Sequence, residues 1–85
     1  MNIIYLPVFI HQFRLLEKSL QEESYEKIEL FKDIKNHKQL RVHKLKGRMS
    51  GRYSFSVNYK VRIVFRYVTK EQVAFLDIGD HDIYK

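Results

Sequence analysis

The first part of the chain combines a short strand-like segment with a helical pattern. Residues 2–6 are mostly β-branched or aromatic, and Pro7 then suits the first turn of a helix but no further ladder pairing. The apolar positions that follow are spaced by four, three and four residues: Phe9, Phe13, Leu16 and Leu20. This spacing puts them on one helical face, so we expect a strand that leads into a helix.

A polar stretch over residues 21–24 separates this pattern from a second one. There Ile28 and Phe31 are followed at helical spacing by either Ile34 or Lys35, and Ser24 is available as an N-cap. No glycine or proline separates the two patterns, so one long helix stays open. The polar break favours a helical hairpin.

The second half of the chain shows the period-two alternation of strands. Gly47 and Gly51 punctuate a basic loop, and a polar loop is expected over 79–82. Between the loops the alternation predicts three strands joined by short turns: 53–58, 61–67 and 73–78.

The middle strand is the most informative about polarity. Ile63 and Phe65 share one face of it, while Arg62 and Arg66 lie on the other. On the neighbouring strand, the serines at 54 and 56 are expected on the solvent side, next to these arginines.

Together these elements predict one α+β domain over residues 1–85 in the order β-α-α-β-β-β, with an antiparallel sheet and an N-terminal helical hairpin packed on one face. The absence of cysteine excludes a disulfide scaffold and thiolate zinc, and 45% hydrophobic residues are enough to form a core. No apolar run is long enough to cross a membrane, and the N-terminus lacks the pattern of a secretory signal. We expect a cytoplasmic protein without membrane contact.

Charge is segregated along the chain. The formal net charge is +6, yet residues 34–70 hold eleven basic residues and no acid. Such a segment repels itself unless a polyanion or an acidic partner faces it, and phosphate backbones are the commonest such partner. A merely soluble basic surface is the alternative interpretation.

Cofactor and metal chemistry find little support in the sequence. The three glycines fit neither a phosphate-binding loop nor a dinucleotide fingerprint. The histidines lack metal-ligand spacing, so a metal site would need Asp80, His81 and Asp82, which we disfavour. No nucleophile elbow supports a serine hydrolase. We expect no cofactor and no metal.

The remaining candidate chemistry is cleavage of RNA. Arg62 is suited to clamp a phosphodiester, loop lysines to contact the backbone, and His81 to move a proton near neutral pH. Metal-independent RNA cleavage needs few other groups, because the ribose 2′-hydroxyl is itself the nucleophile. A solvated sheet face for Arg62 and a turn histidine for His81 are the structural alternatives.

The sequence resembles the RelE/ParE superfamily of type II toxin–antitoxin toxins over roughly residues 40–85. Leu-Lys-Gly at 45–47, the aromatic-rich strand with Arg62, and the Gly-x-His-x-x-Tyr motif ending at Tyr84 carry the resemblance. It implies a toxin whose RelE-like members cut mRNA in the ribosomal A site and so inhibit translation, and which a cognate antitoxin neutralises in a hetero-oligomer. Such modules are also associated with plasmid stabilisation.

The resemblance also implies roles for individual residues. Arg62 matches the phosphate-binding arginine, His81 and His43 match the late and early histidines of YafQ-like members, and Tyr84 matches the C-terminal aromatic. Ser54 and Ser56 stand where RelE carries lysines. The remaining basic residues are expected to bind RNA: Lys44, Lys46, Arg48, Arg52, Lys60 and Arg66.

Two alternatives to a nuclease stay open. A ParE-like inhibitor of DNA gyrase would use the basic face to bind protein and would cleave nothing. An inactive relative would retain only its antitoxin. A gyrase supercoiling assay separates the first alternative from a nuclease.

Overall fold

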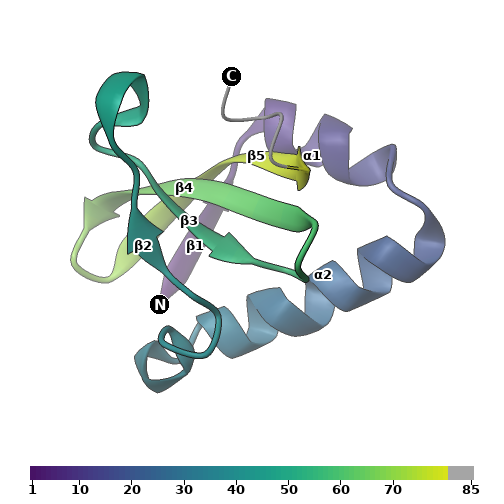
Figure 1. The fold of residues 1–85 in the computed structure, drawn as a ribbon, viewed down its shortest axis with the longest axis horizontal. Coiled ribbons are helices and arrows are strands. Elements are labelled where there is room, and N and C mark those ends of the chain that lie inside the picture. The colour runs from purple at the N-terminus through teal and green to yellow at the C-terminus, as the bar shows by residue number, and fades with distance from the viewer. Residues whose placement is uncertain (81–85) are drawn as a thin grey trace.

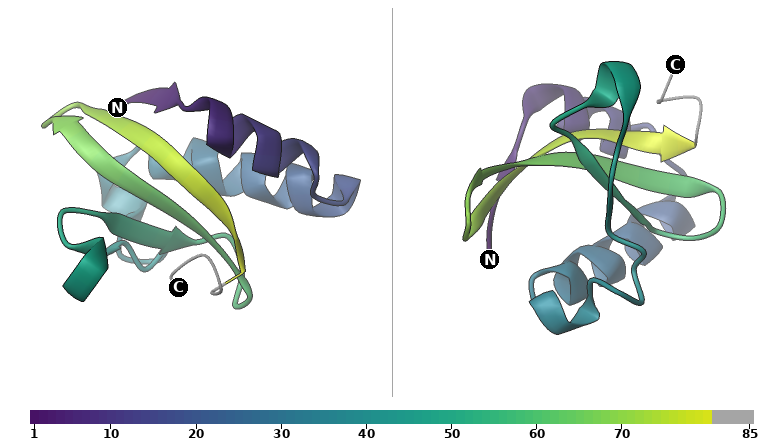
Figure 2. Two further views of the ribbon diagram at one scale, coloured as in Figure 1. Left: turned by 90° about the horizontal axis from the view of Figure 1, so that it is seen from above. Right: turned by 60° about the vertical axis from the view of Figure 1, so that its left-hand side comes forward.

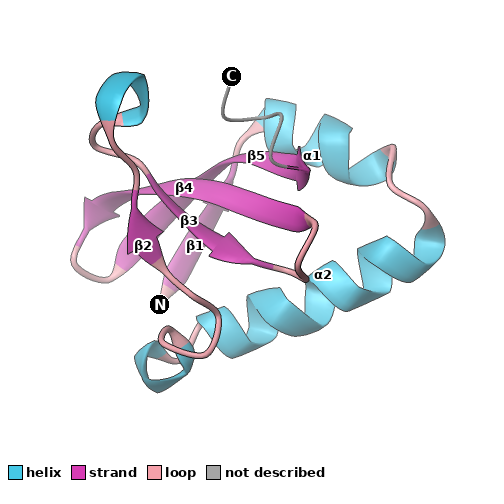
Figure 3. Cartoon of the chain, viewed as in Figure 1, coloured by secondary structure: helices cyan, strands magenta, loops and turns pink. Residues whose placement is uncertain are grey.

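A computed structural model gives the fold and describes residues 1–80 (Figure 1). The first strand, β1 (Asn2–Tyr5), is followed by helices α1 (Pro7–Arg14) and α2 (Lys18–Phe31). One-turn 3-10 helices lie in the connections that follow (Figure 3): η1 (Ile34–Asn36) and η2 (Gly47–Met49). The other strands are β2 (His43–Lys44), β3 (Tyr53–Ser56), β4 (Val61–Thr69) and β5 (Gln72–Asp80).

The five strands form one mixed sheet in the order β1-β5-β4-β3-β2. The α+β class is confirmed, but the sheet is not wholly antiparallel, because β1 pairs with β5 in the parallel sense. The short strand β2 lies in the segment read as a loop, since two residues are too few to show an alternation. Gly79 and Asp80 extend β5 and are not part of a loop.

A bulge in β5 keeps the core continuous. Val64 of β4 pairs with Asp77, but the next residue, Phe65, pairs with Phe75, so Leu76 has no partner of its own. Phe75 and Ile78 are three residues apart, which simple alternation would put on opposite faces. The extra residue brings both into the buried core.

The break between the helices falls at residues 15–17, earlier than the polar stretch suggested. Gln21 explains this boundary, because its side-chain amide donates to the carbonyl oxygens of Phe13 at 3.1 Å and Arg14 at 3.4 Å. These are among the last carbonyls of α1, which have no partner within the helix. Ser24 is therefore not an N-cap. It lies within α2 and is fully buried.

Phe31 joins α2 to the sheet. Its ring stacks on that of Phe55 at a centroid distance of 4.5 Å and meets Phe65 and Phe75 edge-on at 4.9 and 5.5 Å. Figure 2 (right) shows α2 on one side of β4 and β5, with η2 on the other. This face of the sheet therefore holds the aromatic core and leaves the opposite face for other interactions.

Helix α1 runs beside the free edge of β5, beyond the end of β1. There the side chain of Gln12 forms hydrogen bonds to β5. Its Oε1 accepts the backbone N–H of Ile78 at 3.0 Å, as a neighbouring strand would, and its Nε2 donates to the Asp77 carboxylate at 3.2 Å. Within residues 1–80, no helix is long and apolar enough to span a membrane.

The buried hydroxyl of Ser24 offers a test of this core. Its oxygen has no hydrogen-bond partner among the described residues, and a buried unsatisfied hydroxyl is unfavourable. Ser24→Ala should therefore raise the free energy of unfolding by about 1 kcal/mol, measured by urea denaturation. Ser19→Ala, on the exposed side of the same helix, changes helix propensity only and is the control. A loss of stability in Ser24→Ala would contradict the assigned burial.

Candidate functional site

The sheet face opposite Phe31 carries the predicted arginines. Directly paired residues of neighbouring strands project to the same side, and the register pairs Ser56 with Arg62, and Ser54 with Val64. Strand β2 adds one histidine beside Ser54. We call this surface the arginine face and define it by six residues: His43, Ser54, Ser56, Arg62, Val64 and Arg66.

The arginine face has a buried centre. Val64 and Ser54 have no exposed surface, so the expectation that Ser54 faces solvent is wrong. Arg62 and Ser56 are half-buried, whereas Arg66 is exposed. A charge held beside buried groups interacts with a phosphate more strongly than one in bulk water, because the local dielectric constant is lower.

Arg62 is fixed in place by the turn that precedes its own strand. Its Nη1 donates to the backbone carbonyl oxygen of Asn58 at 2.8 Å. A guanidinium has five N–H donors, so this bond orients the group and leaves donors for a ligand. No described residue forms an ion pair with Arg62.

Asn58 organises this turn, which the sequence predicts at 58–60, but it is not among the predicted site residues. Its side-chain oxygen accepts the backbone N–H groups of Lys60 and Val61 at 2.8 and 2.7 Å. Its side-chain nitrogen donates to Glu23 of α2 at 2.9 Å. Asparagine after a strand signals a turn, but the link to α2 depends on tertiary structure. Asn58 therefore connects the support of Arg62 to the helix.

His43 is exposed on β2 and held in one tautomer. Its Nδ1 lies 2.8 Å from the carbonyl oxygen of Arg41, which accepts only, so Nδ1 carries the hydrogen. In the neutral ring, Nε2 then has the free lone pair. His43 and Arg62 are two strands apart, about 10 Å between strand axes. This separation leaves room for a ligand between their side chains.

The other predicted site residues are dispersed. Lys44 pairs with Tyr53, on the core side of the sheet, and so projects away from the arginine face. Lys60 lies in the turn beside Arg62, and the remaining three lie in the connection from β2 to β3: Lys46, Arg48 and Arg52. His81 and Tyr84 lie outside the described residues.

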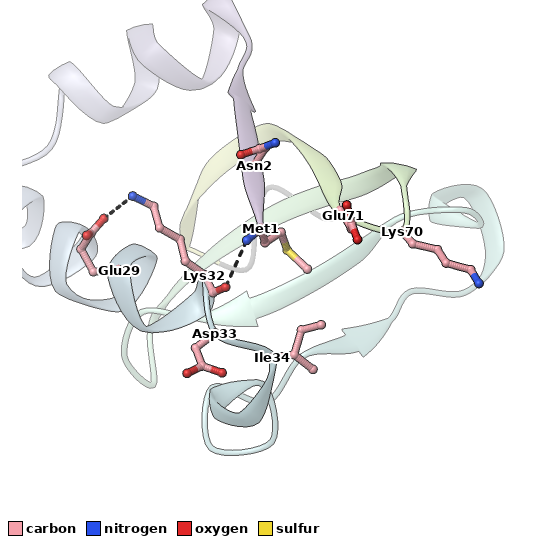
Figure 4. A pocket seen from close by; sticks show the side chains of 8 residues that line it. All are labelled: Met1, Asn2, Glu29, Lys32, Asp33, Ile34, Lys70 and Glu71. Carbon is pink, nitrogen blue, oxygen red and sulfur yellow. Dashed lines mark hydrogen bonds and ion pairs between the residues drawn. The ribbon is translucent and has the colours of Figure 1, made fainter.

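Acidic residues gather elsewhere on the molecule. A cleft of about 600 Å³ lies beside β1. Figure 4 shows three of its lining acids, Glu29, Asp33 and Glu71, together with Lys32 and Lys70. There the Glu29 carboxylate lies 2.6 Å from Lys32 Nζ, and this hydrogen bond raises the pKa of Lys32. Within residues 1–80, no three histidine, aspartate or glutamate side chains are grouped to hold a metal ion.

Comparisons with solved structures identify the fold. The chain resembles YafQ from Escherichia coli, with a TM-score of 0.76, 17% identity, and coverage of 98% of this chain and 96% of that one. It also resembles the YoeB–YefM complex from Staphylococcus aureus, with a TM-score of 0.73 and 19% identity over 95% of this chain and 97% of that one.

A third similar structure is the toxin–antitoxin complex RelBE2 from Mycobacterium tuberculosis, with a TM-score of 0.68 and 14% identity over 93% of this chain and 95% of that one. No protein-family model and no curated protein sequence matches the chain. The chain therefore has the RelE/ParE-like toxin fold, as the resemblance predicted.

The hydrogen bond from Asn58 to Glu23 can be tested by replacing its donor, the Asn58 amide, with a carboxylate. Asn58→Asp keeps the acceptor for the turn but places a carboxylate against Glu23, so we expect a loss of about 1–2 kcal/mol in unfolding free energy at pH 7. Urea denaturation at pH 7 measures the loss.

The control for this prediction is the exchanged pair, Asn58→Asp combined with Glu23→Gln. There the new amide donates to the new carboxylate, so stability should return toward that of the unmodified protein. Equal losses in the single and the paired variant would show that the two side chains do not interact.

Proposed function

We propose that this protein is the toxin of a type II toxin–antitoxin module and cuts mRNA in the ribosomal A site without a metal ion. The observation that carries the proposal is Arg62: a half-buried guanidinium, fixed by the Asn58 carbonyl, on a sheet face built from the acid-free segment 34–70. The fold shared with YafQ, YoeB and RelBE2 supports the toxin role.

The chemistry follows from the groups of the arginine face. A base removes the proton of the ribose 2′-hydroxyl, whose oxygen attacks the adjacent phosphorus. The bond to the 5′-oxygen breaks, and that oxygen takes a proton, which leaves a cyclic phosphate and a free hydroxyl. Arg62 stabilises the negative charge of the pentacoordinate intermediate.

His43 is the described candidate for the base, because its Nε2 lone pair is available on this face. His81 is proposed as the second proton carrier, and Tyr84 as the residue that positions the nucleotide. Three cations of the β2–β3 connection supply contacts to the RNA backbone or the ribosome: Lys46, Arg48 and Arg52. No cofactor enters this scheme.

Replacement of Arg62 tests the proposal. Arg62→Ala should reduce cleavage on mRNA-programmed ribosomes by 100-fold or more and abolish growth arrest, because the phosphate loses its charged donor. Arg62→Lys should recover only part of the activity, since lysine lacks the planar fork. Arg14→Ala, an exposed arginine on α1, is the matched control and should cleave normally.

The same cleavage assay also has results that would contradict the proposal. Unchanged cleavage in Arg62→Ala would refute the role of Arg62. Cuts in naked mRNA would make the enzyme ribosome-independent. No cleavage by the unmodified protein, together with inhibition of gyrase supercoiling, would show the ParE-like activity instead.

We also propose an acidic antitoxin as the partner of the basic surface. The YoeB–YefM and RelBE2 structures are toxin–antitoxin complexes, and an acidic amphipathic segment would complement the eleven positive charges of residues 34–70. The product of the neighbouring reading frame should copurify with this protein and suppress growth arrest. Failure to copurify at low salt would contradict this assignment.

A further inference from the structure

A cleft of about 400 Å³ lies at one end of the arginine face, where α2, the segment before β2 and the turn after β3 meet. Three cations line it: Lys27 from α2, Arg41 from the loop and Arg62 from β4. Ser56 also lines the cleft, as does Tyr59, whose surface is 91% exposed. The cleft therefore combines charged groups from separate elements with one accessible aromatic ring.

Among residues 1–80, no carboxylate lines this cleft. Glu23 is near, but its carboxylate accepts the hydrogen bond of Asn58. Three other clefts of the molecule each include at least one glutamate. None of the three lining cations forms an ion pair with a described residue. An anion is the ligand that this lining favours.

Arg41 occupies a backbone position that favours glycine. Its φ angle is +60°, in the left-handed region that side chains other than glycine rarely adopt. The backbone N–H of Val42 donates to the carbonyl oxygen of His37 at 3.0 Å. The backbone N–H of Arg41 donates to the carbonyl oxygen of Lys38 at 3.1 Å. These two bonds form a Schellman motif, whose left-handed residue is usually glycine. An arginine at this position suggests a use for its side chain.

We propose that this cleft binds a phosphate of single-stranded RNA, next to the phosphate that Arg62 clamps, with Tyr59 stacking on the adjacent base. The proposal rests on the proposed function, because it adds a second nucleotide subsite to the same RNA path. Arg41 and Lys27 form the new subsite, and Arg62 lies at the junction with the arginine face. An aromatic ring beside a cationic groove is the arrangement by which proteins hold single strands.

Arg41→Gly isolates the guanidinium, since glycine accepts the left-handed backbone and keeps the carbonyl that holds His43. The variant should melt at the same or a higher temperature than the unmodified protein. Lys27→Gln removes the second cation without touching the turn. Lys18→Gln, at the exposed start of α2, is the control.

The probe is a fluorescent single-stranded RNA octamer with 2′-O-methyl groups, which cannot be cleaved. Fluorescence anisotropy at several salt concentrations gives affinity and its salt dependence. We expect Arg41→Gly and Lys27→Gln each to weaken binding at least 5-fold and to lower the slope of log affinity against log salt by about 0.7, the value for one phosphate contact on a single strand. Tyr59→Leu should lower affinity but leave the slope unchanged.

The outcomes separate the subsite from the nuclease proposal. Affinities and slopes of Arg41→Gly and Lys27→Gln equal to those of Lys18→Gln would overturn the subsite, even if the protein cleaves mRNA. Loss of RNA binding in these variants, in a protein that cleaves no mRNA, would uphold the subsite and refute the nuclease.

Discussion

The ring of Phe31 is the contact on which the rest of the structure depends. It is stacked between His37 and Phe55, at centroid distances of 4.6 and 4.5 Å and at 12° to both. His37 also donates from Nε2 to the backbone carbonyl of Phe31 at 2.8 Å. One side chain thus joins α2, the sheet and the turn that leads to the arginine face. Because that turn carries Arg41 and orients His43, the core also fixes the candidate site.

The molecule divides its charge between two regions. The acid-free segment 34–70 forms β2, β3, β4 and their connections, whereas the side-chain carboxylates of residues 1–80 all lie outside it, and four of these nine are on α2: Glu22, Glu23, Glu26 and Glu29. Concentrated positive charge opposes folding by self-repulsion. The stacked core on the other side of the sheet opposes this effect. Apart from Lys35, which pairs with Asp33 at 3.6 Å, the cations of this segment form no ion pair with a described residue and remain available to a polyanion. The core and the proposed binding surface therefore occupy opposite faces of the same strands.

The sequence predicts the features that depend on local pattern. The alternation along β4 correctly separates Ile63 from Arg62, and the strand predicted over 73–78 is confirmed as part of β5. Features set by distant contacts could not be read from one sequence. Gln21 sits in a polar stretch that indicated a break, yet its amide satisfies the end of α1 and moves the break upstream.

The candidate site shows the same limit. The arginines and histidines can be chosen as candidates by residue type alone, but the residues that hold them in place cannot. Asn58 and Arg41 matter through a bond to α2 and a left-handed backbone, neither of which leaves a pattern in the sequence. The parallel pairing of β1 with β5 is likewise set by tertiary structure.

Titration with an uncleavable single-stranded RNA, followed by the backbone amide chemical shifts in NMR spectra, reports which surface of the protein binds RNA. We expect the largest shift changes on the arginine face, at His43, Ser56 and Arg62. Changes confined to α1 and the exposed side of α2 would show that RNA binds elsewhere and would refute the assigned surface.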